Sequence, residues 1–255
     1  MDDAALDRLL AAIQDVVRAR ALPAPRGLPY LGLEHASGTN LDLLHTLSTR
    51  GIFRKYELVL DVEAGLGGTS RWLAQRLGCD VIGTAASPRE AAAATDLARR
   101  ARVAGHARCV AARTDALPFR PSRFTHVWIV ETLPRLADAG RALAEAARVL
   151  RHRGLLSIQD LVLRDERARV DVPGWSFATA EARVAALRHL PFVDVELHDR
   201  SAEASERSAP VLAARERLLA LLTRTVPPLA AARAAIGDAL ADGRLRVVHL
   251  HARRV

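Results

Sequence analysis

A glycine-rich turn is the first place in this sequence where residue types and spacing point to chemistry. The stretch LVLDVEAGLGGTSRWLA, residues 58–74, runs from an apolar strand ending in Asp61, through Gly65, Gly67 and Gly68, into a helix. Glycines after a strand allow a tight turn and close approach of a ligand, while the next helix offers free N–H groups. The pattern indicates a site for a nucleotide-like ligand, with a plain strand-to-helix turn as the alternative.

Short apolar strands alternate with helical segments through the middle of the chain. Such alternation produces right-handed βαβ units and a parallel sheet, whose ligands bind at the carboxyl ends of the strands. The pattern predicts strands at 57–62, 80–85, 107–111, 124–130 and 154–162, and helices at 68–77, 88–103 and 138–152.

The two ends of the sequence depart from this alternation. Apolar residues at helical spacing predict an amphipathic helix at 3–20 and a second helix from the cap Asn40 to Gly51. A strand at 191–198 precedes a long helix-prone segment, interrupted at Pro227 and Pro228, and a final strand at 244–252. We therefore expect a single domain with an N-terminal helical cap (1–50), a Rossmann-like core (51–200), a helical lid insertion (201–243) and a last strand (244–255).

Composition limits the classes of partner. The 255 residues are half hydrophobic, enough for one substantial core, and the net charge is +8. The basic residues are scattered arginines with Lys55 as the only lysine, and aromatics make up 4%, which argues against nucleic acid. Cys79 and Cys109 have no CxxC spacing, so neither a disulfide framework nor a metal site is expected. Without a signal peptide or an apolar run near the ~18 residues of a membrane span, we expect a cytoplasmic protein.

Three stretches of the sequence resemble a known family. They are LVLDVEAGLGGTSRWLAQRLGCDVIGTAAS, the block from RTDALPF to GLLSIQDLV, and ADGRLRVVHLHARR. All three are similar to class I S-adenosylmethionine-dependent methyltransferases, particularly the small-molecule branch of sarcosine/dimethylglycine N-methyltransferases and quinone C-methyltransferases. The resemblance implies an α/β fold with a Rossmann-like seven-stranded sheet, mostly parallel, whose last strand runs antiparallel between the fifth and sixth.

The resemblance also implies S-adenosyl-L-methionine as cofactor and assigns residues to it. Asp61, Gly65, Gly67 and Gly68 would frame its methionine end. Asp115 and the backbone of Ala116 would hold the adenine amino group, although Asp115 could equally cap the turn that begins DALPF. Glu131 and Thr132 would line the pocket floor, with the segments 21–40 and 201–243 as the lid.

Two residues depart from the family at the cofactor. Glu63 replaces the first glycine of the loop, and Ala85 replaces the acid that accepts hydrogen bonds from the ribose. Lost hydrogen bonds to a charged group cost on the order of 1.5–3 kcal/mol each, so weak binding is expected. Glu63 could instead turn to solvent or pair with Arg71, and Ser87 could reach the ribose through water. Thr125, Arg135 and the His152-Arg153 turn are further departures.

The leading functional expectation is methyl transfer to an N, O or C nucleophile of a small molecule. Glu131 is the candidate catalytic residue if a general base is needed. The alternative is a catalytically inactive pseudoenzyme that serves as a binding or scaffold subunit, as a homodimer or with an active relative. His249 and His251 share one face of the last strand and are expected on a solvated face rather than at a metal.

Overall fold

The computed structural model describes residues 2–18, 41–204 and 209–255. Its centre is one seven-stranded sheet with the order β3-β2-β1-β4-β5-β7-β6. β7 pairs antiparallel with both β5 and β6, and the other pairs are parallel. The predicted fold, with the last strand between the fifth and sixth, is confirmed. The strands are β1 Leu58–Val62, β2 Asp80–Ala85, β3 Ala107–Ala111, β4 Phe124–Val130, β5 Leu150–Leu163, β6 Phe192–Asp199 and β7 Leu245–Arg254.

Strand burial explains why these segments form the sheet. All seven residues of β4 are buried, as expected of a central parallel strand covered on both faces. The alternation of apolar strands and helical segments predicted β2, β3 and β4 at their observed bounds. β5 begins four residues earlier than predicted. The extension lies beyond the irregular pairing between Phe124 and His126, where the register of β4 on β5 shifts.

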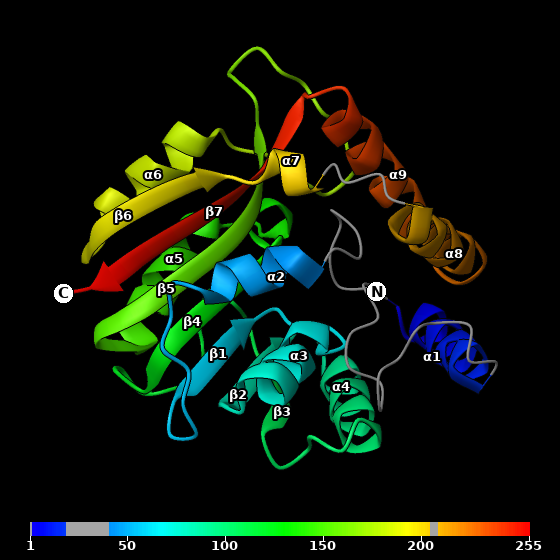
Figure 1. Ribbon diagram of the computed structural model, residues 1–255, viewed down its shortest axis with the longest axis horizontal. Helices are drawn as coiled ribbons and strands as arrows, with labels where there is room; N and C mark the ends of the chain where they lie inside the picture. Colours follow the sequence, from blue (N-terminus) through cyan, green and yellow to red (C-terminus); the bar gives the residue numbers. More distant parts are fainter. Residues whose placement is uncertain (1, 19–40, 205–208) are drawn as a thin grey trace.

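Helices cover both faces of the sheet (Figure 1). One face carries α5 and α6, whose apolar residues form a core with the buried residues of β4 and β5. The opposite face carries α2, α3 and α4. These helices are α2 Leu41–Ser48, α3 Gly68–Leu77, α4 Pro88–Arg100, α5 Ala139–Val149 and α6 Ala180–Arg188, and a short 3-10 turn, η1, spans Leu133–Arg135.

Three further helices pack together beside the glycine turn. They are α1 Asp3–Arg18, α8 Ala209–Thr225 and α9 Pro227–Ala241, and a single turn, α7 Ser201–Ala204, precedes α8 in the chain. Leu6 and Leu9 of α1 are buried in one cluster with Leu222 of α8. In Figure 1, α1 lies against α8 at one end of the molecule, and the C-terminus, which follows β7, lies at the other end.

Several details differ from the sequence-based expectations. α6 was not predicted, and Thr179 caps it by accepting a hydrogen bond from the Ala182 N–H at 3.2 Å. Pro227 begins α9 rather than only interrupting a helix, because proline suits the first helical turn. The predicted cap Asn40 and the lid segment 21–40 lie outside the described residues. Among the described helices none is long and apolar enough to cross a membrane.

Candidate cofactor site

The glycine turn keeps the backbone shape that its pattern predicts. Gly65 and Gly67 have positive φ angles of 55° and 73°. Glu63 also has a positive φ, 56°, a region in which a side chain costs about 1–2 kcal/mol. Its N–H donates to Thr84 Oγ1 at 2.9 Å. The glutamate thus adopts a backbone conformation that favours glycine, and the change from the family pattern lies in its side chain.

A cavity of about 370 Å³ opens beside this turn. Its size falls within the usual range of small-molecule sites. Four charged side chains line it, namely Glu63, Glu90, Arg135 and Arg233. Most of the remaining wall is apolar and comes from Leu9, Leu66, Pro173, Trp175, Val226, Pro228, Leu229 and Ala232. A side chain added at Gly65 would meet nothing within 4 Å, so the loop backbone is accessible from the cavity.

Charges around the cavity act on Glu63. Burial raises the pKa of Glu63, the positive charge of Arg135 opposes that rise, and the carboxyl group of Glu90 adds to it. The Arg135 guanidinium also lies 5.8 Å from the centre of the Trp175 ring, a cation–π arrangement. Arg71 is fully buried and donates to the carbonyl of Leu66. Arg135 is therefore the basic residue that compensates Glu63, whereas Arg71, the alternative partner considered from the sequence, is directed to the Leu66 carbonyl.

Beyond the end of β2, the acid that lines the cavity is Glu90, which is not at the position where the family has its acid. Ala85 is fully buried, and its neighbour Ala86 lines the cavity. Ser87 is the N-cap of α4, because its hydroxyl accepts the Glu90 N–H at 3.1 Å. Glu90 was not predicted as a site residue, yet its side chain, in the first turn of α4, lines the cavity. Its only sequence signal is an acid in the first turn of the helix that follows the second strand.

The other residues assigned to the cofactor fall into two groups. Asp61 is buried at the end of β1 and accepts the Ser70 hydroxyl at 2.7 Å, which fixes the start of α3 to the sheet. Gly67 is the N-cap of α3, and no side chain caps this helix. Asp115 instead accepts two hydrogen bonds from Arg113, at 3.0 and 2.7 Å, which hold its pKa below the usual range. Neither Asp115 nor Ala116 is among the residues lining the cavity.

Glu131 belongs to a buried polar chain that crosses three strands. It follows β4 directly with a positive φ of 52° and is only 2% exposed. Gln159 of β5 donates to its carboxylate at 2.7 Å, and the other end of the Gln159 amide lies 3.1 Å from Nε2 of His249 on β7. Thr132 is also buried and donates to the Val130 carbonyl at 3.1 Å. Glu131 is followed closely in sequence by η1, whose last residue, Arg135, lines the cavity. Glu131 itself does not line the cavity.

The prediction that His249 and His251 lie on a solvated face of the last strand is wrong. His249 and His251 are 1% and 4% exposed, because β7 lies inside the sheet and α2 and α7 cover this face. Burial, together with neighbouring positive charges, lowers the pKa of His249 to about 3. Burial and the same kind of neighbours lower the pKa of His251 to about 4. Both imidazoles are therefore neutral at physiological pH.

Neither cysteine thiol is activated as a nucleophile. Cys79 and Cys109 are free, and burial raises the pKa of each to about 12. Within the described ranges, no group of three or more histidine, cysteine or acidic residues could hold a metal ion.

The turn and the cavity fit a nucleoside cofactor with an amino-acid end. The uncapped start of α3 and the accessible backbone at Gly65 suit a carboxylate, since helix N–H groups and the helix dipole favour negative charge. The sheet order and a glycine turn after its first strand define the class of nucleotide-binding α/β proteins.

Comparisons with known proteins identify the family more closely. Residues 60–158 match the model of the methyltransferase domain family. The chain is 33% identical over 147 residues (58% of this chain, 45% of the relative) to 2-methyl-6-phytyl-1,4-hydroquinone methyltransferase from Synechocystis. It is 32% identical over 108 residues (42% and 39%) to sarcosine/dimethylglycine N-methyltransferase from Halorhodospira halochloris. The chain therefore carries a class I S-adenosylmethionine-dependent methyltransferase domain, as the sequence resemblance predicts.

The extent of these similarities differs between sequence and structure. The aligned stretches span less than half the length of the curated relatives. The structure of the [4+2]-cyclase SpnF superposes with a TM-score of 0.75 at 20% identity, covering 98% of this chain and 94% of that one. This likeness extends the shared fold to the helices outside the matched domain. S-adenosylmethionine is the cofactor of the family, and solved structures of this fold contain it.

Proposed function

We propose that this protein is an S-adenosylmethionine-dependent methyltransferase that methylates an N, O or C nucleophile of a small molecule. One observation carries the proposal: the glycine turn opens onto a cavity of about 370 Å³ instead of closing around Glu63. A turn that had lost its ligand would be free to fill this space with the glutamate side chain.

The residues of the turn would hold the cofactor at its amino-acid end. Gly65 and the first N–H groups of α3 would bind the carboxylate, and Arg135 would offset the negative charge of Glu63. Glu90 would accept a hydrogen bond from a ribose hydroxyl in place of Ala85. Asp115 and the backbone of Ala116 remain the proposed adenine contacts. When bound, the cofactor supplies an electrophilic methyl group.

The wall of the cavity favours an apolar acceptor. Leu9, Val226, Leu229 and Trp175 give this side a hydrophobic surface, which suits an aromatic or prenylated molecule better than a small zwitterion. We propose that α1, α8 and α9 form the lid that excludes water from the acceptor, and that alignment supplies most of the rate. Glu131, oriented by Gln159, is the proposed general base if the acceptor must lose a proton.

The test has two parts. Isothermal titration with S-adenosylmethionine and S-adenosylhomocysteine measures cofactor binding directly. Release of S-adenosylhomocysteine is then measured with hydroquinones and phenols in one set and with glycine, sarcosine and dimethylglycine in another. Turnover with the phenolic set alone supports an apolar acceptor. Glu131→Gln should lower kcat without changing cofactor affinity if it acts as a base.

An inactive scaffold subunit remains the alternative function. Glu63 and Ala85 are the residues that favour it, since one adds charge and the other removes a hydrogen-bond acceptor at the proposed site. Folded protein that binds neither form of the cofactor at millimolar concentration would support this alternative and overturn the enzymatic proposal.

A further inference from the structure

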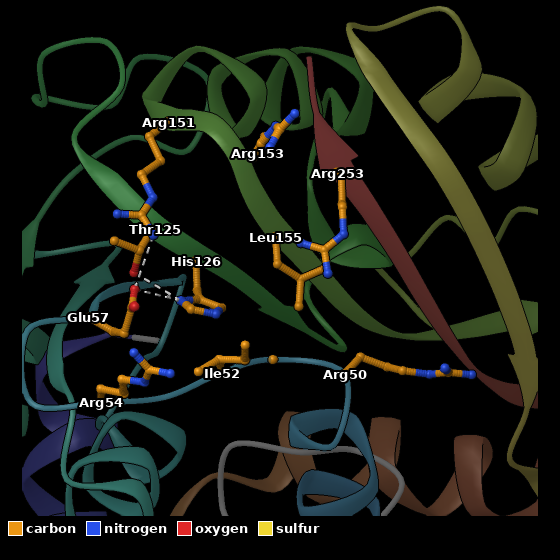
Figure 2. Close-up of a pocket in the computed structure, with 11 residues that line it drawn as sticks. Arg50, Ile52, Arg54, Glu57, Thr125, His126, Arg151, Arg153, Leu155 and Arg253 are labelled. Atoms are coloured by element: carbon orange, nitrogen blue, oxygen red, sulfur yellow. Dashed lines mark hydrogen bonds and ion pairs between the residues drawn. The ribbon is translucent and has the colours of Figure 1, made fainter.

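A second cavity lies at the end of the sheet opposite the glycine turn (Figure 2). Glu57 precedes β1, His126 belongs to the start of β4, Arg151 lies at the start of β5, and Arg253 lies at the end of the antiparallel β7. These positions place the cavity at the amino ends of the parallel strands. Its volume is about 190 Å³, and its lining residues are Arg50, Gly51, Ile52, Arg54, Glu57, Thr125, His126, Arg151, Arg153, Leu155 and Arg253.

Positive charge dominates this cavity. The lining contains five arginines and a single acid, Glu57. Arg151 Nη2 lies 3.5 Å from the Glu57 carboxylate, whereas Arg50 extends away from the cavity to Glu196, 3.1 Å distant. For the side chains of Arg153 and Arg253, the structure records no ion pair or hydrogen bond with any described residue. The cavity thus gathers more guanidinium groups than its one carboxylate can balance.

The floor of the cavity is ordered by packed side chains. The side chains of Glu57 and His126 are each 7% exposed, with Nδ1 of His126 3.8 Å from the carboxylate. The same nitrogen lies 2.9 Å from the hydroxyl of Thr125. The Phe53 ring stacks on the imidazole with 4.5 Å between ring centres. A fixed floor of this kind lets the arginines above it present donors at defined places.

His126 adds no charge of its own. Burial, together with the positive charges of Arg151 and Arg253, lowers the pKa of His126 to about 4, although the Glu57 carboxylate opposes this shift. The positive excess at neutral pH therefore comes from the arginines alone. Repulsion among them is relieved if an anion enters the cavity.

The chemistry of the lining defines the ligand. Guanidinium groups bind phosphate oxygens through paired hydrogen bonds, which makes arginine the preferred residue for phosphate recognition. A volume of about 190 Å³ is sufficient for one phosphate or pyrophosphate group. We propose that this cavity binds the phosphate or pyrophosphate group of a small anionic ligand, held by Arg151, Arg153 and Arg253.

Titration with sodium pyrophosphate and with inorganic phosphate at low ionic strength tests the proposal. We expect saturable 1:1 binding that the double variant Arg153→Ala/Arg253→Ala weakens at least tenfold. The matched control Arg76→Ala/Arg188→Ala removes two exposed arginines from α3 and α6 and should change affinity less than twofold. Pyrophosphate should leave S-adenosylmethionine binding unaffected, because the two cavities lie at opposite ends of the sheet.

Three outcomes would overturn the phosphate site. They are absence of saturable binding by the wild type, equal weakening in the control variant, and binding of a short single-stranded DNA that pyrophosphate does not displace. Circular dichroism and thermal unfolding establish that each variant is folded. If the double alanine variant does not fold, the single variants Arg153→Gln and Arg253→Gln are titrated instead. Each is expected to lose at least threefold in affinity for pyrophosphate.

Discussion

Arg135 acts electrostatically on Glu63 across the candidate cofactor cavity. Each residue departs from the methyltransferase pattern, Glu63 at the first glycine of the loop and Arg135 at a position where histidine is frequent. The structure brings both onto the same cavity with opposite charges. The added carboxylate is thereby partly compensated within the site that it alters.

Replacing Glu63 by glycine should improve cofactor binding and stability together. The change removes a side chain from a left-handed backbone conformation, with φ of 56°, that costs about 1–2 kcal/mol. It also removes a carboxylate that would face the carboxylate of the cofactor. We expect about tenfold tighter binding of S-adenosylmethionine by titration, equivalent to about 1.4 kcal/mol, and a higher urea midpoint. Glu63→Gln is the control, since it removes the charge but keeps the strain; equal stability of the two variants would contradict the strain argument.

Cofactor affinity should depend on pH through Glu63. Its pKa is raised, so the folded protein retains this proton to a higher pH than an ordinary carboxyl group with a pKa of 4.5. The cost of ionising Glu63 is absent below its unfolded pKa and fully present above its folded pKa. Because ionised Glu63 would face the carboxylate of the cofactor, binding of S-adenosylmethionine should weaken as pH rises through this window in the wild type and stay flat in Glu63→Gln. A parallel pH profile in both proteins would assign the dependence to another group.

His249 should make the fold sensitive to acid. Its pKa falls from 6.5 to about 3 on folding, so the folded state binds fewer protons than the unfolded state between these values. Its contribution to stability is present above pH 6.5 and is lost as pH falls through this window. The loss of unfolding free energy is about 2 kcal/mol at pH 5, because stability falls by about 1.4 kcal/mol for each pH unit below the unfolded pKa of 6.5. Urea unfolding at pH 7.5 and 5 should show a smaller pH effect in His249→Gln than in wild type, while His152→Gln, which changes an exposed histidine, should match wild type.

The buried ion pair between Asp160 and Arg183 should be sensitive to loss of one partner. Arg183 Nε donates to Asp160 at 2.7 Å, and the carboxylate side chain is fully buried. Burial raises the pKa of Asp160 to about 6 even though Arg183 opposes the rise. Arg183→Met should lower the free energy of unfolding by about 3–5 kcal/mol, because it leaves a buried charge unpaired. Asp160→Asn/Arg183→Met should recover most of that loss; a double variant as unstable as the single one would show that packing, not charge, is responsible.

Sequence periodicity predicted most of the fold because strands and helices alternate clearly between β1 and β5. The helix α3 occupies the predicted residues 68–77, where a glycine turn and Gly78 mark both ends. The helix α6 escaped prediction because Arg183 occupies one of its buried positions and interrupts the apolar pattern. A charged residue buried by an ion pair cannot be distinguished by sequence from a charged residue on the surface.

The candidate site was predictable in its backbone but not in its side-chain partners. The glycine pattern located the turn, since positive φ angles require specific residues. The basic residue that compensates Glu63 is determined by how η1 approaches the turn, so the sequence offered only the neighbouring Arg71 as one possible partner and did not indicate Arg135. The histidines of β7 were misassigned for a related reason, because alternation along a strand tells which residues share a face but not what covers it.

The position of β7 between β5 and β6 also constrains the order in which the molecule can fold. Leu155 pairs with Arg253, and Phe192 pairs with Arg254, so both neighbouring strands depend on one late segment. Until residues 245–254 have left the ribosome, β5 presents an unpaired edge and β6 has no strand to join. Contacts between segments so distant in sequence are slow to form. A nascent chain of this protein therefore exposes an apolar strand edge from the completion of β5 until β7 has been made, a period in which chaperone binding would protect it from aggregation.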